Sequence, residues 1–166
     1  MKSAESPARE AVELYGSLVI RVAWHILRDR EEARDIYQEA FLRLHSVWLE
    51  GQQIDNVKAW LCRTAINAAL NRRRRLIRET SLDTGGAELQ ESRRAGAARN
   101  EKALLLDRVR QLVERLPDRQ RQVFVLRNFE GLPFSEIAQM LDCTAESARA
   151  NEYQALRKIR NWMNNV

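Results

Sequence analysis

The chain has 166 residues, of which 45% are hydrophobic and 31% are charged, and its formal net charge is +5. This length suits one medium domain or two small ones, and the hydrophobic content excludes wholesale disorder. No apolar run approaches the roughly 20 residues of a membrane span, and no signal-peptide pattern opens the chain, so we expect a cytoplasmic protein. Glycine and proline are sparse, and long strings of Ala, Leu, Glu, Arg and Gln favour an all-α fold.

Three helices are predicted in the first half of the chain. Residues 8–28 carry apolar side chains spaced by three or four, which indicates one amphipathic helix. Asp29 is placed to cap a second helix, whose apolar stripe runs to Trp48. The stretch EGQQIDN, residues 50–56, interrupts the periodicity and predicts a loop. A third helix is predicted from about Asn56, and it ends in the arginine run NRRRRLIRE.

A change of character near residue 80 divides the chain into two helical domains. Residues 80–100 hold three of the six glycines and show little periodicity, which predicts a flexible linker. We therefore expect one domain at residues 1–79 and a second at residues 101–166. Between Asn56 and Arg78 there are seven basic residues and no acidic one, and such a stretch of one sign indicates a polyanionic partner.

The second domain is expected to begin with two helices. Apolar side chains recur at helical spacing from Leu104 to Leu116, which predicts the first of them. Pro117 ends that helix or begins the next. Proline has no amide proton to donate inside a helix, whereas the first turn of a helix does not need that proton. The stretch PDRQRQVFVLRNFEG then predicts a short helix that is closed by Gly131.

The last part of the chain predicts two helices joined by a tight turn. Ser135 is placed to cap the first helix, Asp142 tolerates the left-handed turn position, and Thr144 is placed to cap the second. This pattern fits a helix-turn-helix, whose second helix lies in a major groove of DNA. Helices joined by tight turns also occur in plain bundles, so the pattern alone leaves a pure packing role open.

The residues that usually carry catalysis are not arranged for it. Cys62 and Cys143 match no zinc spacing and are expected to be two small buried thiols. His25 and His45 have no Cys, Asp or Glu partner at ligand spacing. There is also no Ser/His/Asp arrangement, glycine-rich phosphate loop or HExxH motif. The sequence therefore predicts that the protein is not an enzyme and has no catalytic residue, metal or cofactor.

Two blocks of the sequence resemble the sigma factors of bacterial RNA polymerase. The stretch LPDRQRQVFVLRNFEGLPFSEIAQMLDCTAESARANEYQALRKIR resembles region 4 of the sigma-70 family. EEARDIYQEAFLRLH resembles region 2.2, and VKAWLCRTAINAALNRRRR resembles regions 2.3 and 2.4. Because a short linker and little else accompany these blocks, the chain is similar to the extracytoplasmic-function (ECF, group IV) sigma factors. The resemblance implies a region 2 helical bundle and a region 4 helix-turn-helix.

The resemblance implies that the second helix binds the coiled coil of the polymerase clamp. Asp35, Gln38, Glu39 and Arg43 match the family positions and lie on one side of this helix. The residues themselves equally fit an ordinary solvated face.

The third helix, by the same resemblance, faces the −10 promoter element. The loop before the helix and polar groups on it capture an exposed base, while Arg63 and the arginine run hold phosphates. Trp60 matches a family aromatic, although burial in the core is its favoured role. The arginine run also fits a solvated helix end whose cations complement the helix dipole. The full −10 set is Gln53, Asp55, Asn56, Trp60, Arg63, Asn67, Asn71, Arg72, Arg73, Arg74 and Arg75.

Region 4, by the same resemblance, reads the −35 element through the last helix. The −35 set is Arg119, Arg127, Thr144, Glu146, Ser147, Arg149, Ala150, Tyr153, Gln154 and Arg157. Ala150 stands where the family commonly has a hydroxyl, and Asn151 and Gln154 stand where it has arginines. An Asn or Gln can read adenine with two hydrogen bonds, so these departures leave the −35 sequence open but not the site.

Glu152 is an unexpected acid in a helix that is predicted to bind DNA. At about 100° per residue it shares an inward stripe with Ala148 and Ala155. We favour a partly buried carboxylate that pairs with Arg149 or with an arginine of the 117–129 helix. Acceptance from a cytosine amino group and a contact with an anti-sigma factor are the alternatives.

The resemblance also implies partners. These are core RNA polymerase, through its clamp coiled coil and flap, promoter DNA, and a membrane-anchored anti-sigma factor that would hold the protein at the inner membrane without insertion of the chain itself. We expect a monomer or a heterodimer with the anti-sigma factor. A stand-alone helix-turn-helix regulator and a helical module that sequesters another factor are the competing hypotheses.

Overall fold

The computed structural model describes residues 5–83 and 101–164, and within these ranges it contains helices and turns but no strand. The expectation of an all-α fold in two helical units is therefore confirmed. We call the first unit the N-terminal bundle. Its helices are α1 (Glu5–Leu27), α2 (Arg30–Leu49) and α3 (Val57–Asp83). We call the second the C-terminal unit. Its elements are α4 (Glu101–Glu114), α5 (Asp118–Phe124), the π-helical turn η1 (Val125–Phe129), α6 (Phe134–Leu141) and α7 (Ala145–Asn164).

Local capping explains where the helices of the N-terminal bundle begin. The Asp29 side chain accepts hydrogen bonds from the backbone N–H groups of Glu31 and Glu32 at 2.9 and 3.0 Å, as predicted. The Asn56 side chain accepts from the backbone N–H of Ala59 at 2.9 Å and so caps α3. These bonds satisfy donors that the first turn of a helix leaves without a partner.

Helix α3 is longer than the sequence indicated. It continues through residues 80–83, which were assigned to the linker. The Thr80 hydroxyl donates to the carbonyl of Leu76 at 2.9 Å, so this threonine is accommodated within the helix rather than ending it. The rest of the predicted linker, residues 84–100, lies outside the described residues.

The first helix of the C-terminal unit is only partly the amphipathic element that was predicted. Leu112 and Val113 are buried, but Leu104 and Leu105 are about half exposed. The regular spacing of leucines correctly predicted a helix. It did not predict which leucines are buried, because only the last turns of α4 pack against α5 and α7.

The helix predicted after Pro117 ends differently from a regular α-helix. Its last five residues form the π-helical turn η1, in which the backbone N–H of Glu130 donates to the carbonyl of Val125 at 3.1 Å. Gly131 follows with a φ of 69°, a left-handed conformation that glycine adopts without strain. The predicted stop at this glycine is confirmed.

Two of the three caps predicted for the helix-turn-helix are confirmed. Asp142 has a φ of 54° and a ψ of 57°, the left-handed turn position. The Thr144 hydroxyl accepts from the backbone N–H of Ser147 at 3.1 Å. Ser135 does not cap α6, because that helix begins at Phe134 and its N-cap is Pro133.

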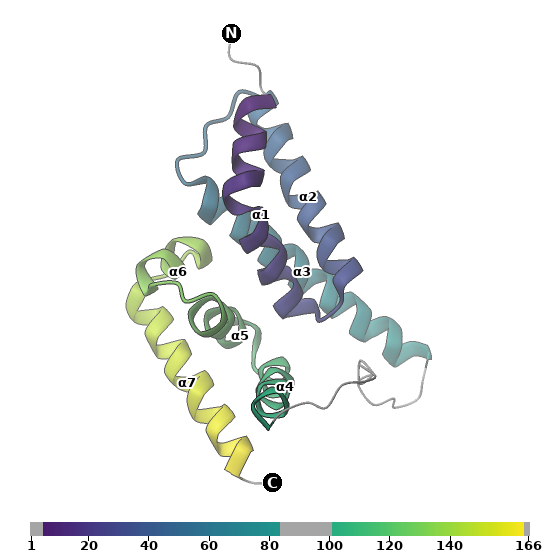
Figure 1. The fold of residues 1–166 in the computed structure, drawn as a ribbon, viewed down its shortest axis with the longest axis vertical. Helices are drawn as coiled ribbons and strands as arrows, with labels where there is room; N and C mark the ends of the chain where they lie inside the picture. The colour runs from purple at the N-terminus through teal and green to yellow at the C-terminus, as the bar shows by residue number, and fades with distance from the viewer. Residues whose placement is uncertain (1–4, 84–100, 165–166) are drawn as a thin grey trace.

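The two units pack against each other across one shared apolar core. Residues of α1, α2 and α3 form a single buried cluster with Val123, Leu126, Met140 and other side chains of the C-terminal unit. In Figure 1, α5 and α6 lie beside the bundle, and α7 runs along the far side of the C-terminal unit. A second cluster joins α4, α5, η1 and α7. The predicted DNA-reading helix α7 therefore faces away from the bundle, whereas α3 faces the C-terminal unit.

Candidate nucleic-acid interface

The predicted polymerase-binding residues form a continuous polar face on α2. Asp35, Gln38, Glu39 and Arg43 are all exposed and line one shallow hollow. The same hollow is lined by Leu42, Ser46 and Arg72, which the prediction omitted. Helical spacing places Leu42 and Ser46 on this face, three or four residues after predicted members. Leu42 is 67% exposed, so the face has an apolar side chain available for contact.

The arginine run points in three directions, because successive residues of an α-helix are rotated by about 100°. Arg72 turns toward α2, with its Nε 3.0 Å from Glu32 and an Nη 4.0 Å from Asp35. Arg73 and Arg74 turn toward the C-terminal unit. The remaining member of the run, Arg75, is exposed and lies 3.9 Å from Glu79. Arg72 is therefore placed beside the predicted polymerase face.

The polar residues predicted for base capture lie around the start and middle of α3. Gln53 and Asp55 are exposed in the loop, and Asn67 and Asn71 are exposed on the helix. Trp60 is half-buried and packs against the core, which agrees with the favoured role. These side chains form an accessible polar edge of the bundle.

The first turns of α3 contact α6 of the helix-turn-helix. Asn56 donates to the side chain of Gln139 at 2.6 Å, and Arg63 donates to the main-chain oxygens of Gln139 and Met140. Lys58 lies 2.6 Å from a carboxylate oxygen of Glu136. Lys58 belongs to the basic stretch noted in the sequence, but its partner is about eighty residues away and no local pattern points to it.

The predicted −35 residues gather at the start and along the outer face of α7. Tyr153 is 64% exposed, and Ala150 and Arg157 are exposed beside it. Thr144, Glu146, Ser147, Arg149 and Gln154 lie on or beside the same face and range from half-buried to exposed. An exposed helix with an aromatic and two cations fits the dimensions and charge of a major groove.

Phe134 connects two of the predicted −35 arginines, although the sequence analysis gave it no role. The guanidinium of Arg127 lies 4.7 Å from the centre of its ring, and that of Arg149 lies 5.3 Å away. Cations over an aromatic face are attracted by its quadrupole. Arg127 also donates to the carbonyl of Leu132 at 3.0 Å, so its side chain is held in place.

Arg119, the other predicted −35 arginine that lies before the turn, makes a contact within the C-terminal unit. It donates to the carbonyl of Leu141 at 2.7 Å, at the end of α6. This bond ties the start of α5 to the helix-turn-helix.

Glu152 lies where the helical wheel placed it, but its partner differs from the prediction. Ala148 and Ala155 are fully buried beside it, and Glu152 is half-buried. Its carboxylate accepts a hydrogen bond from the amide of Asn128 at 3.3 Å rather than from an arginine. Arg149 instead lies 4.0 Å from Glu146, which is one turn earlier in α7.

His25, which the sequence gave no role, lies between the two units. Its ring stacks on Phe129 with 4.5 Å between centres, and its Nε2 lies 3.5 Å from a carboxylate oxygen of Glu130. Burial, together with Arg110 and other nearby arginines, lowers the pKa of His25 to about 4. A neutral imidazole is therefore built into this contact at pH 7.

The two cysteines differ in their burial. Burial raises the pKa of Cys62 to about 12, which makes its thiol unreactive. Cys143 is half-buried rather than fully buried as predicted. Among the described residues no group of His, Cys, Asp and Glu side chains is arranged to hold a metal ion, and no helix is both long and apolar enough to span a membrane.

Comparison with known families finds two matches in chain order. The family "Sigma-70 region 2" matches residues 11–79, and the family "Sigma-70, region 4" matches residues 106–159. The first match contains the α2 face and most of α3, and the second contains α5, η1, α6 and most of α7. Each predicted contact surface therefore falls within a matched family region.

Relatives agree with these family matches. The RNA polymerase sigma-H factor of Pseudomonas aeruginosa is 29% identical over 154 residues, which cover 87% of this chain and 80% of that protein. The ECF RNA polymerase sigma-E factor of Escherichia coli K12 is 30% identical over 139 residues, covering 76% of this chain and 71% of that protein. A chain in the co-crystal structure of the sigma factor RpoE with the anti-sigma factor NepR from Bartonella quintana has the same fold, with a TM-score of 0.70 at 17% identity over 94% of this chain and 96% of that chain.

Proposed function

Because the chain belongs to the sigma-70 family of RNA polymerase sigma factors, we propose that it is a dissociable initiation factor of the ECF group. It directs core polymerase to defined promoters and helps to open the −10 region. The observation that supports this most directly is the presence of both regions, in order, with a separate surface for each task. A stand-alone regulator needs only the helix-turn-helix and has no use for the α2 face or for the basic helix α3.

The α2 face is the proposed contact with core polymerase. Its exposed charges and the exposed Leu42 offer polar and apolar contact on one side of a single helix. A coiled coil presents the same kind of surface, since charged side chains flank its apolar seam. The second proposed contact with core polymerase is between region 4 and the flap.

The promoter is proposed to bind two other surfaces. The loop before α3 and the exposed Asn67 and Asn71 receive unpaired bases of the −10 element, and the arginines of α3 hold its phosphates. The exposed face of α7 reads the −35 element in the major groove.

We also propose that an anti-sigma factor controls the protein. A chain in a sigma factor complex with an anti-sigma factor shares the fold across nearly the whole chain, which supports a partner of this type. An anti-sigma factor that is anchored in the inner membrane would hold the chain on the cytoplasmic side.

The test of the function is run-off transcription with purified protein, core polymerase and promoter-containing genomic fragments. We expect transcripts with defined start sites only when the protein is present. A chain in which Gln38 and Glu39 are replaced by alanine serves as the matched control, because it removes part of the α2 contact and keeps Asp35, which lies 4.0 Å from the −10 residue Arg72. If core enzyme with the intact protein never initiates at a defined site, the proposed function is wrong.

Replacement of Arg149 by alanine tests the −35 surface. We expect the free energy of promoter binding to fall by about 1–3 kcal/mol, with relaxed preference at one base pair, because a bidentate base contact is lost. Replacement of Arg157 by alanine is the control. Loss of a phosphate contact weakens binding to all DNA sequences alike and reduces the salt dependence of binding. Binding of holoenzyme to a library of −35 variants measures both effects. An unchanged base preference in the Arg149 variant would contradict base reading by this residue.

A further inference from the structure

Two arginines from different segments of the C-terminal unit meet at one aromatic ring. Arg127 belongs to the π-helical turn η1, and Arg149 belongs to the second turn of α7. Their guanidinium carbons lie 4.7 and 5.3 Å from the centre of the Phe134 ring. Phe134 is the first residue of α6, and α6 contacts both η1 and α7 (Figure 1). The ring therefore lies where the elements that carry the two arginines converge.

The Phe134 ring is held in place by its neighbours. The preceding residue, Pro133, has its φ angle fixed by its own ring and found here at −70°. The backbone N–H groups of Glu136 and Ile137 donate to the Pro133 carbonyl at 3.1 Å, so the first turn of α6 is formed directly at Phe134. The side chain of Phe134 is half-buried and packs against the shared apolar core. An aromatic side chain also has few rotatable bonds, so the ring is a rigid support.

Arg127 is fixed at two points. Its guanidinium donates to the main-chain oxygen of Leu132 at 3.0 Å and lies against the Phe134 ring. Both partners are neutral, so these contacts orient the cation without neutralising its charge. A phosphate that approaches this surface therefore meets an arginine whose direction is already set.

Arg149 depends more strongly on the ring, because the rest of its surroundings hold it loosely. Its side chain is 61% exposed, and its ion pair with the exposed Glu146 is long, at 4.0 Å. Such a pair contributes little in water. A long, exposed arginine loses much rotamer freedom when it makes a base contact. The contact with Phe134 restricts the guanidinium before DNA arrives and so lowers this cost of binding.

The shared ring also fixes the two cations relative to each other. Like charges repel, whereas the negative faces of an aromatic ring attract both guanidinium groups. A phosphate contact sets the register of a protein on the duplex, and a bidentate base contact needs the guanidinium plane to approach the base edge in one orientation. Phe134 thus connects an arginine placed for the first task, Arg127, with one placed for the second, Arg149.

We infer that Phe134 is a positioning residue for −35 recognition, which orients Arg149 toward a base edge and ties it to Arg127 on a neighbouring phosphate. The inference rests on the proposed function and deepens it, since Phe134 is absent from the predicted −35 set. The ring acts through the arginines and not by touching DNA. Loss of the ring should therefore lower discrimination between −35 sequences more than it lowers binding to DNA in general, because both positive charges remain.

The first test measures binding of holoenzyme to a library of −35 variants, with Phe134→Leu in the full-length chain. We expect the preference at the base pair read by Arg149 to fall about threefold to tenfold, with an unchanged salt slope. Phe134→Tyr should restore the preference, because tyrosine keeps the aromatic face. Phe129→Leu is the matched control and should keep the preference, since Phe129 is a half-buried aromatic of the same unit whose ring contacts His25 and Phe124.

A double-mutant cycle shows whether Phe134 acts through Arg149. The base preference is a ratio of affinities, so a fraction of unfolded protein lowers binding to every sequence equally and leaves the ratio unchanged. We expect Phe134→Leu to have no further effect on this ratio in a chain that already carries Arg149→Ala. A further loss of preference in that chain would mean that the ring itself touches DNA, and the inference would be overturned.

A spectroscopic test needs neither polymerase nor DNA. Protons that lie over an aromatic face are shifted upfield in NMR spectra, so the side-chain protons next to the guanidinium groups of Arg127 and Arg149 should show such shifts in the intact chain. Both should return to ordinary values in Phe134→Leu and stay shifted in Phe129→Leu. Ordinary values in the intact chain would overturn the inference.

The results separate this inference from the proposed function. If the intact holoenzyme and the Phe134→Leu holoenzyme discriminate equally between −35 sequences, Phe134 positions nothing, while run-off transcription with the intact protein can still succeed. If the intact protein never supports initiation at a defined site, the proposed function is wrong, and the inference about promoter reading fails with it.

Discussion

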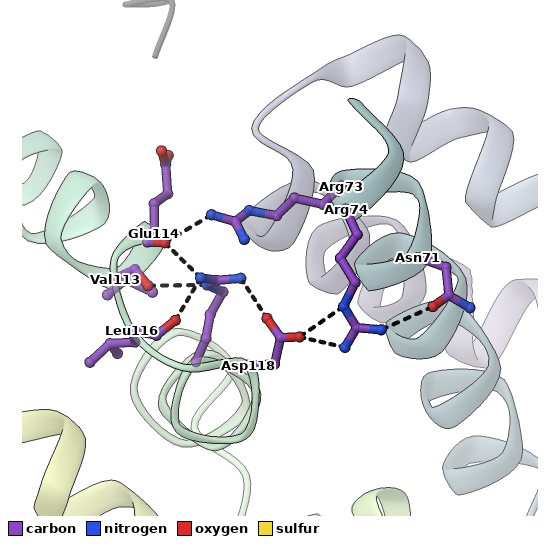
Figure 2. A network of polar contacts seen from close by, with 8 residues as sticks. Asn71, Arg73, Arg74, Val113, Glu114, Leu116 and Asp118 are labelled. Carbon is purple, nitrogen blue, oxygen red and sulfur yellow. Dashed lines mark hydrogen bonds and ion pairs between the residues drawn. The ribbon is translucent and has the colours of Figure 1, made fainter. Parts of the chain in front are cut away.

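Replacement of Arg121 by methionine is expected to lower the free energy of unfolding by about 3 kcal/mol, the cost of breaking a buried charged network. The side chain of Arg121 is 3% exposed and bonds three main-chain oxygens and one carboxylate. Burial lowers its pKa to about 10, so the guanidinium remains charged at neutral pH. Without it, the carbonyl of Leu116 loses the guanidinium that bonds it (Figure 2), while those of Val113 and Glu114 each lose one of two donors; a buried acceptor left without a partner costs about 1–3 kcal/mol.

Urea denaturation followed by circular dichroism measures this change. The matched control is Arg119→Met, on the same helix, since Arg119 is exposed and bonds one main-chain oxygen at 2.7 Å and, at 3.4 Å, the side chain of Gln122. We expect the control to lose about 1 kcal/mol, because its side chain is exposed and only its bond to Leu141 is short. Equal losses in the two variants would contradict the central position that we assign to Arg121.

The free energy of unfolding of the folded chain should fall when the pH is lowered from 6.5 to 4. His25 should account for a large part of this fall. Its pKa is lowered from 6.5 to about 4 by burial, then by Arg110, Arg28 and Arg21. The folded chain therefore disfavours the protonated imidazole. The contribution is complete above pH 6.5 and is lost as the pH approaches 4, and it amounts to about 3 kcal/mol.

The measurement compares the unfolding free energy of the intact chain and of His25→Gln across this range. Glutamine keeps a polar group near Glu130 and has no proton to bind, so the variant should show a shallower loss between pH 6.5 and 4. Glu130, whose carboxylate lies 3.5 Å from the imidazole, is present in both proteins, so the comparison isolates His25. Identical slopes for the two proteins would show that His25 is not the group that responds.

The sequence predicted what depends on neighbours in the chain. The cap at Asp29, the left-handed Asp142 and the inward position of Glu152 each follow from a few adjacent residues or from helical spacing. Ser135 was the local exception, because Pro133, two residues earlier, takes the N-cap position and α6 begins at Phe134.

Contacts between distant segments could not be predicted in this way. Nothing near His25 in the sequence indicates Phe129 or Glu130, which are more than a hundred residues away. The sequence also treated the arginine run as one phosphate-binding unit. The fold divides it, because Arg72 meets α2 whereas Arg73 and Arg74 meet the C-terminal unit. Domain packing decides these partners, and a single sequence carries no record of it.

The apolar core shared by the two units also bears on how long the protein survives in a cell. When the units separate, Leu126, Met140 and their neighbours lose their cover and face water. Chaperones and proteases act on such exposed segments, so an opened chain that is not held by another macromolecule is the more rapidly degraded form. We therefore expect separation of the units to shorten the lifetime of a free chain.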